Sequence, residues 1–405
     1  IFPMFKSLNF KVILFGFIFT FFSSFGQSFF LGLFNSSIRE ALSITHGQFG
    51  SIYASATLLS SFILVWIGKK IDDINILKFA SYVIALLAVS SFLFSKISSI
   101  IFLFFSIFLM RLSGQGLMSH TATTTISRYF EKSRGRALSI TWLGLSLAEF
   151  ILPLLIVFLL TVIEWRNIWL SISILVIIVL PIVSFFLVKN VNLDLKKKKI
   201  KKNKKQKKIK QWKRIEVLKD YRFYIVCINM LAMPWIATGS FVYQSFISTS
   251  KGWGPYVIAQ SFMIYSILSV ITLFFSGFLI DKFSSRRLLI YMNIPLLFSA
   301  FVLYYYNSPF SSFIFLGLIG ISNGLANVLG SSTWAEIYGV KYIGSIKALT
   351  TALMVFSTAF GTALFGLLID NNFSIEQIAL VSGAYISFSI LLLFMVKNKL
   401  NPTYI

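Results

Sequence analysis

Charged residues are scarce in this sequence. They make up 12% of the 405 residues, whereas hydrophobic residues make up 57%. A soluble domain carries roughly twice that share of charge. The few charges gather in short clusters, and the stretches between them, such as 12–38, 223–250 and 288–335, hold none. This pattern excludes an ordinary soluble domain and indicates a membrane protein.

Cysteine, histidine and acidic residues are also few. The chain has one cysteine, Cys227, two histidines and 13 acidic residues. A single cysteine cannot form an intrachain disulfide. An enzyme embedded in a membrane needs a cluster of nucleophilic, acid–base or metal-binding side chains, and these residue types are too sparse to supply one. We therefore expect no catalytic residue, no bound metal and no cofactor.

Each uncharged stretch is long enough to cross a bilayer, which requires about 20 apolar residues in a helix. The longest, 288–335, accommodates two crossings separated by Asn307-Ser308-Pro309. Continuous apolar runs differ from the alternating pattern of membrane β-barrels. The sequence thus predicts an all-α membrane protein with twelve transmembrane helices. We expect them at 10–34, 47–68, 76–95, 98–125, 137–161, 166–188, 223–247, 256–280, 287–306, 310–334, 345–369 and 376–396.

Lysine and arginine are distributed unevenly between the two sets of loops. Most of the 37 fall in alternate loops and at both termini, while the other loops hold Arg39, Lys96, Arg166 and Lys251. Loops rich in these residues remain in the cytoplasm. We therefore predict a multi-pass protein of a cell membrane, namely a bacterial inner membrane, with both termini cytoplasmic.

The segment KKKKIKKNKKQKKIKQWKR, at 196–214, carries much of the net charge of +24. Basic runs can bind nucleic acid. Between membrane spans, a cytoplasmic linker near anionic lipid head groups is favoured instead, where each cation contributes about 1 kcal/mol. We predict an N-terminal six-helix bundle at 1–188, this basic linker at 189–222 and a C-terminal six-helix bundle at 223–405. We expect lipid head groups but no nucleic acid as partners, and a monomer.

The two halves share a weak repeat. Gly68 and Asp72 precede Gly277 and Asp281 by the same interval that separates Tyr129 and Gly135 from Tyr338 and Gly344. The matched positions fall in corresponding cytoplasmic loops. Six helices in each half give both halves the same orientation, as in a parallel repeat.

The stretch FSGFLIDKFSSRRLLIY, at 275–291, contains a spacing that resembles the major facilitator superfamily. The loop motif of that family is Gly-x-x-x-Asp-(Arg/Lys)-x-Gly-x-(Arg/Lys)-(Arg/Lys). The matching residues are Gly277, Asp281, Lys282, Arg286 and Arg287, and Ser284 replaces the second glycine. The first copy, GKKIDDINILKF at 68–79, keeps Gly68 and Asp72 but lacks the paired cations. The loop RYFEKSRGRALSI, at 128–140, is similar to the corresponding loop of carboxylate carriers in the family.

The resemblance implies two six-helix bundles that move a small solute by alternating access. It also implies that the loop residues Gly68, Asp72, Gly277, Asp281, Arg286 and Arg287 act as a cytoplasmic latch. In such a latch the glycine allows close helix packing, and the aspartate accepts hydrogen bonds at a helix N-terminus. The alternative to a latch is that these are ordinary positively charged residues of cytoplasmic loops. The spacing favours the latch at 277–287 and leaves both interpretations open at 68–78.

Two ionisable residues, Arg111 and Glu149, lie about halfway along consecutive predicted helices. A charge at that depth costs about 2.5–3.5 kcal/mol even on the most lenient insertion scale. We therefore expect Arg111 and Glu149 to pair or to share a hydrated cavity. Gln115 lies one turn from Arg111 on the same face. The functional interpretation is a substrate or proton pathway, and the structural alternative is an ion pair that only fixes packing.

Three further polar residues are candidates because the resemblance implies that helices 1, 4, 7 and 10 line the cavity. These are Gln27, Asn323 and Asn327. Their structural alternative is interhelical hydrogen bonding. His120 is expected to be a packed histidine. RLSGQG, at 111–116, resembles the Arg-Gly motif of the fourth helix in the family, but its glycines are shifted, which weakens the association with antiport.

The predicted function is secondary transport of a small solute, and coupling to protons is a further hypothesis. A lone buried arginine favours an organic anion as substrate, although sugars, amino acids and drugs remain open. A channel or a membrane-embedded enzyme are the alternatives. A channel needs no paired loop motif, and an enzyme needs a catalytic cluster that the sequence lacks.

Overall fold

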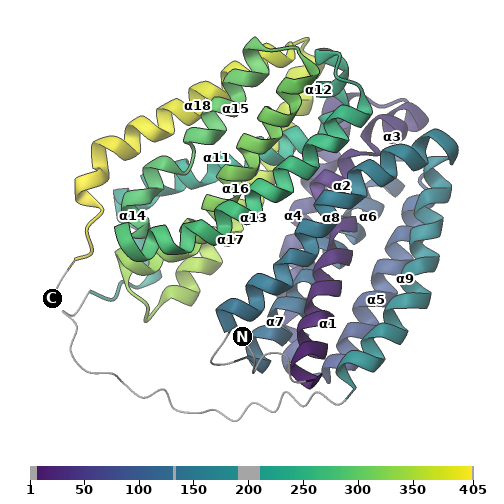
Figure 1. Ribbon diagram of the computed structural model, residues 1–405, viewed down its shortest axis with the longest axis horizontal. Helices are drawn as coiled ribbons and strands as arrows, with labels where there is room; N and C mark the ends of the chain where they lie inside the picture. Colours follow the sequence, from purple (N-terminus) through teal and green to yellow (C-terminus); the bar gives the residue numbers. More distant parts are fainter. Residues whose placement is uncertain (1–6, 131–133, 190–209, 404–405) are drawn as a thin grey trace. The chain divides into compact units, whose positions relative to one another are not determined.

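The computed structural model describes residues 7–130, 134–189 and 210–403 (Figure 1). These residues form helices and connecting turns and contain no strand. Among them are 12 helices long and apolar enough to cross a membrane. The predicted all-α fold and the number of spans are thereby confirmed. The spans are Asn9–Gly32, His46–Lys69, Ile76–Ser95, Ile100–Tyr129, Gly135–Val162, Trp165–Val188, Tyr221–Val242, Pro255–Ile280, Ser285–Tyr305, Pro309–Tyr338, Ser345–Asp370 and Ile375–Lys399.

Several spans are built from more than one helical segment. The segments before the basic linker are α1 (Ser7–Ser23), η2 (Ser24–Gly26), α2 (Ser28–Gly32), α3 (Asn35–Leu42), α4 (His46–Lys69), η3 (Lys70–Asp72), α5 (Ile76–Ser95), α6 (Ile100–Met110), η4 (Arg111–Met118), α7 (Ser119–Tyr129), α8 (Arg134–Val162) and α9 (Trp165–Val188). Those after it are α10 (Arg214–Leu218), α11 (Tyr221–Val242), α12 (Gln244–Lys251), α13 (Pro255–Phe283), α14 (Ser285–Leu288), η5 (Leu289–Tyr291), α15 (Ile294–Tyr305), α16 (Pro309–Tyr338), α17 (Ile343–Asp370), α18 (Ile375–Val396) and η6 (Lys397–Lys399).

The chain divides into two compact units. Unit 1 comprises Ile1–Leu195 together with the short segments Phe241–Phe246 and Thr362–Asp370. Unit 2 comprises Lys196–Ser240, Ile247–Gly361 and Asn371–Ile405. The finer division at 188 and 223 stays a prediction. Of the predicted linker, residues 190–209 lie outside the described residues, and α10 belongs to unit 2.

Helices in unit 1 pack through small residues. The helices α1 and α8 contact each other, as do α5 and α9 (Figure 1). A side chain on Gly144 of α8 would collide with the carbonyl oxygen of Phe17. The hydroxyl of Thr20 donates to the carbonyl oxygen of Thr141 at 2.5 Å. Small residues allow such close approach in membranes, where packing rather than exclusion of water drives helix association.

Unit 2 shows the same principle on the face of α16 that contacts α13. Gly317, Gly320 and Gly324 recur along this face. A side chain on Gly320 would collide with the carbonyl oxygen of Tyr265, and one on Gly324 would lie 2.6 Å from that of Ser269. These glycines therefore set the distance between the two helices.

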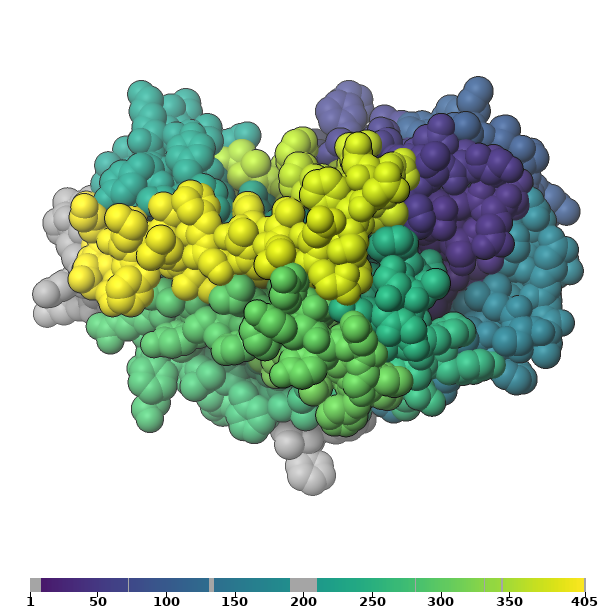
Figure 2. Space-filling model, turned by 90° about the horizontal axis from the view of Figure 1, so that it is seen from above, coloured from purple at the N-terminus to yellow at the C-terminus, as the bar shows by residue number. Residues whose placement is uncertain are grey.

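Large apolar side chains cover the outer faces of the long helices. On α18, Leu391, Phe394 and Met395 are exposed, and Figure 2 shows this helix in yellow along the surface of unit 2. Exposed apolar faces of this extent are unfavourable in water and are favourable against lipid tails. The exposure of these side chains thus agrees with twelve membrane spans.

Several predicted continuous helices are interrupted. The first span breaks at Ser24–Gly26, and the fourth contains the π-helix η4. The seventh is interrupted after Val242 and the chain is helical again in α12, which starts at Gln244. At this interruption the carbonyl oxygen of Val242 accepts a hydrogen bond from the side chain of Asn35 at 2.9 Å. The ninth begins with the short turns α14 and η5, and Pro295 lies in the first turn of the regular helix α15, where proline is favoured.

Candidate functional site

Arg111 is the most deeply buried of the residues predicted for the substrate or proton pathway, with 3% of its surface exposed. Its Nη1 donates a hydrogen bond to the carbonyl oxygen of Gly26 at 3.0 Å. The guanidinium carbon lies 5.3 Å from the ring centre of Tyr53, within the range of a cation–π contact. The Nε–H group has no partner in the described part of the chain. The cation is thus held by one carbonyl and one aromatic ring.

The Gly26 carbonyl is available because the first span breaks beside it. The 3-10 turn η2 ends at Gly26, and Gln27 has an extended backbone with φ −82° and ψ 154°. The regular helix restarts at Ser28. At such an interruption the carbonyl groups leave the helical hydrogen-bond ladder and need other donors. Arg111 supplies one of these donors.

The break in the first span packs directly against the π-helix η4. A side chain on Gly26 would collide with the backbone nitrogen of Gln115 and the carbonyl oxygen of Met110. One on Gly114 would lie 2.6 Å from the backbone nitrogen of Gly26. Two glycines therefore permit this backbone contact. It places Gln27, which follows Gly26, near Gln115, which follows Gly114, and both side chains are half-buried.

Residues 111–118 form the π-helix that carries both Arg111 and Gln115. In a π-helix each amide bonds to the carbonyl five residues earlier, which is less stable than the α-helical pattern. Such segments occur frequently at functional sites. Arg111, Gln115 and Gln27 therefore form one cluster around two irregular backbone segments in unit 1. We refer to these three residues as the Arg111 cluster.

Glu149 lies on α8 and is 9% exposed. In the described part of the chain, neither a hydrogen bond nor an ion pair joins its carboxyl to another group. The predicted ion pair between Arg111 and Glu149 is therefore absent from this conformation, and the pairing prediction is wrong for it. The physical reason is the turn η2, which contacts both η4 and α8 and whose Gly26 carbonyl accepts from Arg111.

Asn323 and Asn327 belong to unit 2, on α16. The side-chain nitrogen of Asn323 donates to the hydroxyl oxygen of Ser269 on α13 at 3.0 Å. This is the interhelical bond expected under the structural alternative. Asn327 is exposed. The role of both residues as ligands stays a prediction.

The first loop motif lies close to the end of the fourth span. The Nε2 atom of His120 lies 2.9 Å from the carbonyl oxygen of Gly68, within hydrogen-bond distance. Arg128 donates from Nη1 to the carbonyl oxygen of Ile71 at 3.1 Å. The side chain of Asp72 lies outside the described residues. Contacts from α7 thus hold this loop, and the motif spacing alone did not indicate Arg128.

The second loop motif is organised by Glu336, near the end of α16. One carboxylate oxygen, Oε2, accepts hydrogen bonds from the backbone nitrogens of Ser285 and Arg286 at 2.9 and 3.2 Å. The other, Oε1, lies 3.1 Å from Nε of Arg286. One cation of the loop motif, Arg286, is therefore paired with a carboxylate in this structure.

Two other expectations for this loop have different outcomes. A side chain on Gly277 would meet nothing within 4 Å, so close packing at this glycine is not observed in this structure, and its role in a latch stays a prediction. The side chain of Asp281 lies outside the described residues. The sequence analysis did not identify Glu336 as a partner of this loop. Its position gave a signal, because Glu336 is the charged residue that ends the apolar run 288–335.

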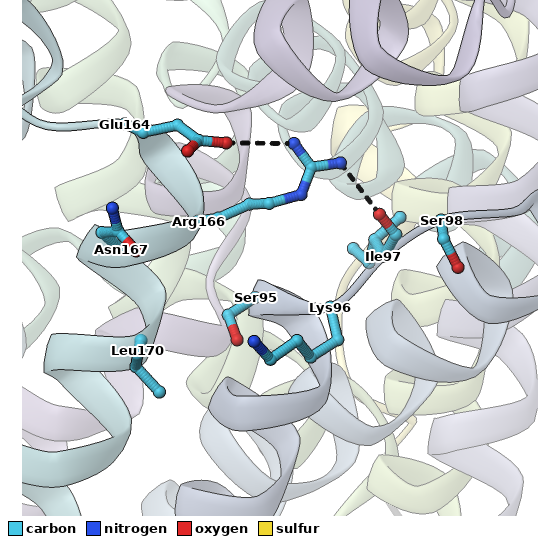
Figure 3. A pocket seen from close by; sticks show the side chains of 8 residues that line it. All are labelled: Ser95, Lys96, Ile97, Ser98, Glu164, Arg166, Asn167 and Leu170. Atoms are coloured by element: carbon cyan, nitrogen blue, oxygen red, sulfur yellow. Dashed lines mark hydrogen bonds and ion pairs between the residues drawn. The ribbon is translucent and has the colours of Figure 1, made fainter.

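A separate cavity of about 350 Å³ lies in unit 1 at the start of α9. Its polar lining includes Lys96, Glu164, Arg166 and Asn167 (Figure 3). Arg166 donates to the Glu164 carboxylate at 3.3 Å and to the carbonyl oxygen of Ile97 at 3.0 Å. None of the predicted site residues lines it, and its arginine is already paired.

Comparison with known proteins identifies the family of this fold. The sequence model of the Major Facilitator Superfamily matches residues 16–264 and 224–403. The solved structure of a bacterial homolog to the human lysosomal transporter Spinster, in an inward-facing and occupied conformation, is similar over 98% of this chain and 99% of that chain, with 13% identity and a TM-score of 0.74. The nucleoside transporter NupG is similar over 97% and 100%, with 14% identity and a TM-score of 0.70.

No curated protein matches the sequence, and identities this low establish the fold alone. The family match extends over nearly the whole chain, and it agrees with the twelve spans and with the repeated loop motif. The chain therefore belongs to the major facilitator superfamily and is a multi-pass membrane transporter rather than an enzyme.

Proposed function

We propose that this transporter carries a small organic anion by alternating access and that Arg111 binds the anionic group. The observation that carries the proposal is a buried arginine with no carboxylate partner in the described residues. A cation within a membrane span is costly, and one carbonyl with one aromatic ring compensates it only in part. A bound carboxylate would complete the compensation, because the guanidinium group can bind both carboxylate oxygens.

Gln27 and Gln115 supply neutral hydrogen-bonding groups beside Arg111. Each amide side chain offers both a donor and an acceptor, which suits the hydroxyl or carbonyl groups of a small metabolite. Both side chains are half-buried. In this proposal Arg111 selects the charge of the substrate, while the two glutamines help to select its polar substituents.

Glu149 is proposed as the site that couples transport to protons. It is 9% exposed, and in the described residues neither a hydrogen bond nor an ion pair joins its carboxyl to another group. Carboxyl groups within membrane spans commonly belong to proton pathways. Since Glu149 and Arg111 do not pair, each is free to serve a separate role, one for the proton and one for the anion.

The charge pattern supports the proposed orientation in the membrane and the contact of the linker with lipid, while the two moving bundles and the monomer are proposed from the family resemblance. We place both termini, the basic linker and the two loop motifs on the cytoplasmic side of a bacterial inner membrane. The bundles at 1–188 and 223–405 then alternate access to the substrate, while the linker contacts anionic lipid. The transporter acts as a monomer.

Uptake into proteoliposomes tests the proposal. The purified protein would be given labelled lactate, succinate and benzoate, each beside its neutral amide, with and without an inward proton gradient. We expect uptake of at least one carboxylate but not of its amide, and at least a tenfold loss in Arg111→Gln. Arg166→Gln is the matched control, because Arg166 has a carboxylate partner. Uptake of neutral solutes alone, or undiminished carboxylate uptake by Arg111→Gln, would contradict the proposal.

A further inference from the structure

We infer that Tyr53 and Thr57 of α4 complete a buried carboxylate site with Arg111 inside unit 1. This inference rests on the proposed transport of an organic anion and adds a second helix to the binding site. Neither residue belongs to a motif that the sequence displays. The argument depends on which face of α4 meets the fourth span and on which polar groups there lack partners.

One face of α4 follows the fourth span along its length. At Tyr53 the aromatic ring contacts the guanidinium group of Arg111. Further along, the side chain of Leu64 lies against Gly116. At the end of the helix the Gly68 carbonyl contacts His120. These three contacts, at successive levels, define the face of α4 that packs against residues 111–120.

Thr57 lies on this same face. It follows Tyr53 by one helical turn, and residues four apart are stacked on one side of a helix. It also precedes Leu64 by seven residues, which is two turns. Thr57 is therefore placed between the level of Arg111 and the level of Gly116. Its side chain is 1% exposed, as expected for a residue enclosed between two helices.

Three polar groups along this contact have no hydrogen-bond partner in the described part of the chain. They are Nε of Arg111, the hydroxyl of Tyr53 and Oγ1 of Thr57. All three residues are at least nine-tenths buried. Buried polar groups nearly always have partners. Three unpartnered groups along one helix–helix contact therefore indicate that the site lacks a ligand.

The chemistry of these groups specifies the ligand. Nε of Arg111 is a donor only, and each hydroxyl can donate one hydrogen bond. A carboxylate accepts several hydrogen bonds through its two oxygens and also neutralises the guanidinium charge. A neutral amide would satisfy the hydroxyls but leave that charge uncompensated. One buried cation matches the single negative charge of a carboxylate better than the double charge of a phosphate.

The surroundings of Arg111 leave one edge of its guanidinium group for this ligand. The Tyr53 ring contacts the guanidinium group, and Nη1 is occupied by the Gly26 carbonyl. The carboxylate is therefore expected at the Nε edge, on the side of α4. A carboxylate that accepts hydrogen bonds from both α4 and η4 would also fix the position of these two helices relative to each other when substrate is bound.

The test measures equilibrium binding of labelled lactate, succinate and benzoate to the purified full-length protein. The variants are Tyr53→Phe and Thr57→Val, which remove each hydroxyl with little change of shape. We expect the Kd of the best-bound carboxylate to rise about tenfold in each, or about 1.4 kcal/mol. Thr57→Ser, which keeps the hydroxyl, should bind as the natural protein does.

Two control variants come from unit 2. Tyr385→Phe removes a hydroxyl that donates to the carbonyl oxygen of Ile228 at 2.8 Å. Thr333→Val removes a buried hydroxyl that also lacks a partner in the described residues. Neither is placed at the Arg111 cluster, and both should leave the Kd unchanged. If Tyr53→Phe fails to fold, the contrast between Thr57→Val and Thr57→Ser decides the inference.

The outcomes separate this inference from the proposal on which it rests. If the natural protein binds a carboxylate and both hydroxyl-removing variants bind it equally well, the inference is wrong and the anion proposal stands. If the natural protein prefers none of the carboxylates to its amide, both are wrong. A tenfold loss in Thr57→Val that Thr57→Ser does not show supports the inference.

Discussion

At the scale of single residues, the location of the buried charges was predictable and their partners were not. Arg111 and Glu149 stand out in the sequence because charges are so rare in the spans. The partner of Arg111 is the main-chain carbonyl of Gly26, and a side-chain pattern carries no information about a carbonyl released by a broken helix. The first of the two expectations for Arg111 and Glu149, an ion pair, therefore failed, and the second, a shared hydrated cavity, stays a prediction.

A double-mutant cycle tests the separation of the two groups. Since Arg111 and Glu149 form no ion pair, Arg111→Gln and Glu149→Gln should have additive effects on the free energy of unfolding, to within about 0.5 kcal/mol. Unfolding of each variant in detergent would be followed by tryptophan fluorescence. A coupling energy well above that value would show that the two groups interact directly in a populated conformation.

A second prediction at this scale concerns Glu336. Glu336→Gln removes the ion pair with Arg286 and weakens the acceptor for two backbone amides. Hydrogen bonds to charged groups are worth about 1.5–3 kcal/mol, so we expect a loss of stability of about 1–2 kcal/mol because the site is partly exposed. Glu164→Gln is the control, since Glu164 forms an exposed pair. Equal effects of the two changes on unfolding would count against the assigned role of Glu336.

At the scale of elements, the sequence predicted the helices but not their interruptions. Hydropathy averaged over a window reports the length of an apolar run, and the first span qualifies as a membrane helix by this measure although its helix breaks at Gly26. The break depends on a tertiary contact, in which Gly26 and Gly114 bring two backbones together. The π-helix that follows Met110 is likewise invisible to an average of hydrophobicity. The irregular backbone that forms the candidate site thus arises from packing.

The contact between the two glycines can be tested by adding one methyl group. Gly26→Ala would place a Cβ atom against the backbone of Met110 and Gln115, and overpacking of this kind costs about 1–3 kcal/mol. Gly330→Ala is the control, since nothing lies within 4 Å of that position. We expect a lower unfolding temperature and weaker carboxylate uptake for Gly26→Ala, and neither change for Gly330→Ala. Equal stability of the two variants would show that the backbones need not approach closely.

At the scale of the whole molecule, the repeat was visible in the sequence, but its chemistry differs between the halves. In the first half a cation, Arg128, binds the Ile71 carbonyl oxygen at the end of η3. In the second half an anion, Glu336, accepts from backbone nitrogens at the start of α14. Each charge suits the dipole of the helix end that it meets. The two halves therefore share the position of the loop, but the side chain that contacts the loop is a cation in the first half and an anion in the second.

The basic linker gives a prediction at the same scale. The C-terminal part of the linker is bound to unit 2 by two hydrogen bonds. The backbone nitrogen of Trp212 donates to the carbonyl oxygen of Tyr338 at 3.1 Å, and the side-chain oxygen of Gln211 accepts from the backbone nitrogen of Lys341 at 2.8 Å. Replacing 196–209 by a neutral linker of equal length should preserve uptake in correctly inserted protein. Trp212→Ala should lower stability, because the ring packs against Tyr338. Loss of uptake in the neutral-linker variant would show that the charges serve transport itself.

The central claim is that Arg111 binds the anionic group of the substrate. The most direct measurement is the ratio of Kd values for a transported carboxylate and its neutral amide, in the natural protein and in Arg111→Gln. The account predicts a preference for the carboxylate of at least tenfold in the natural protein and none in the folded variant. A folded Arg111→Gln that keeps the full preference would contradict it.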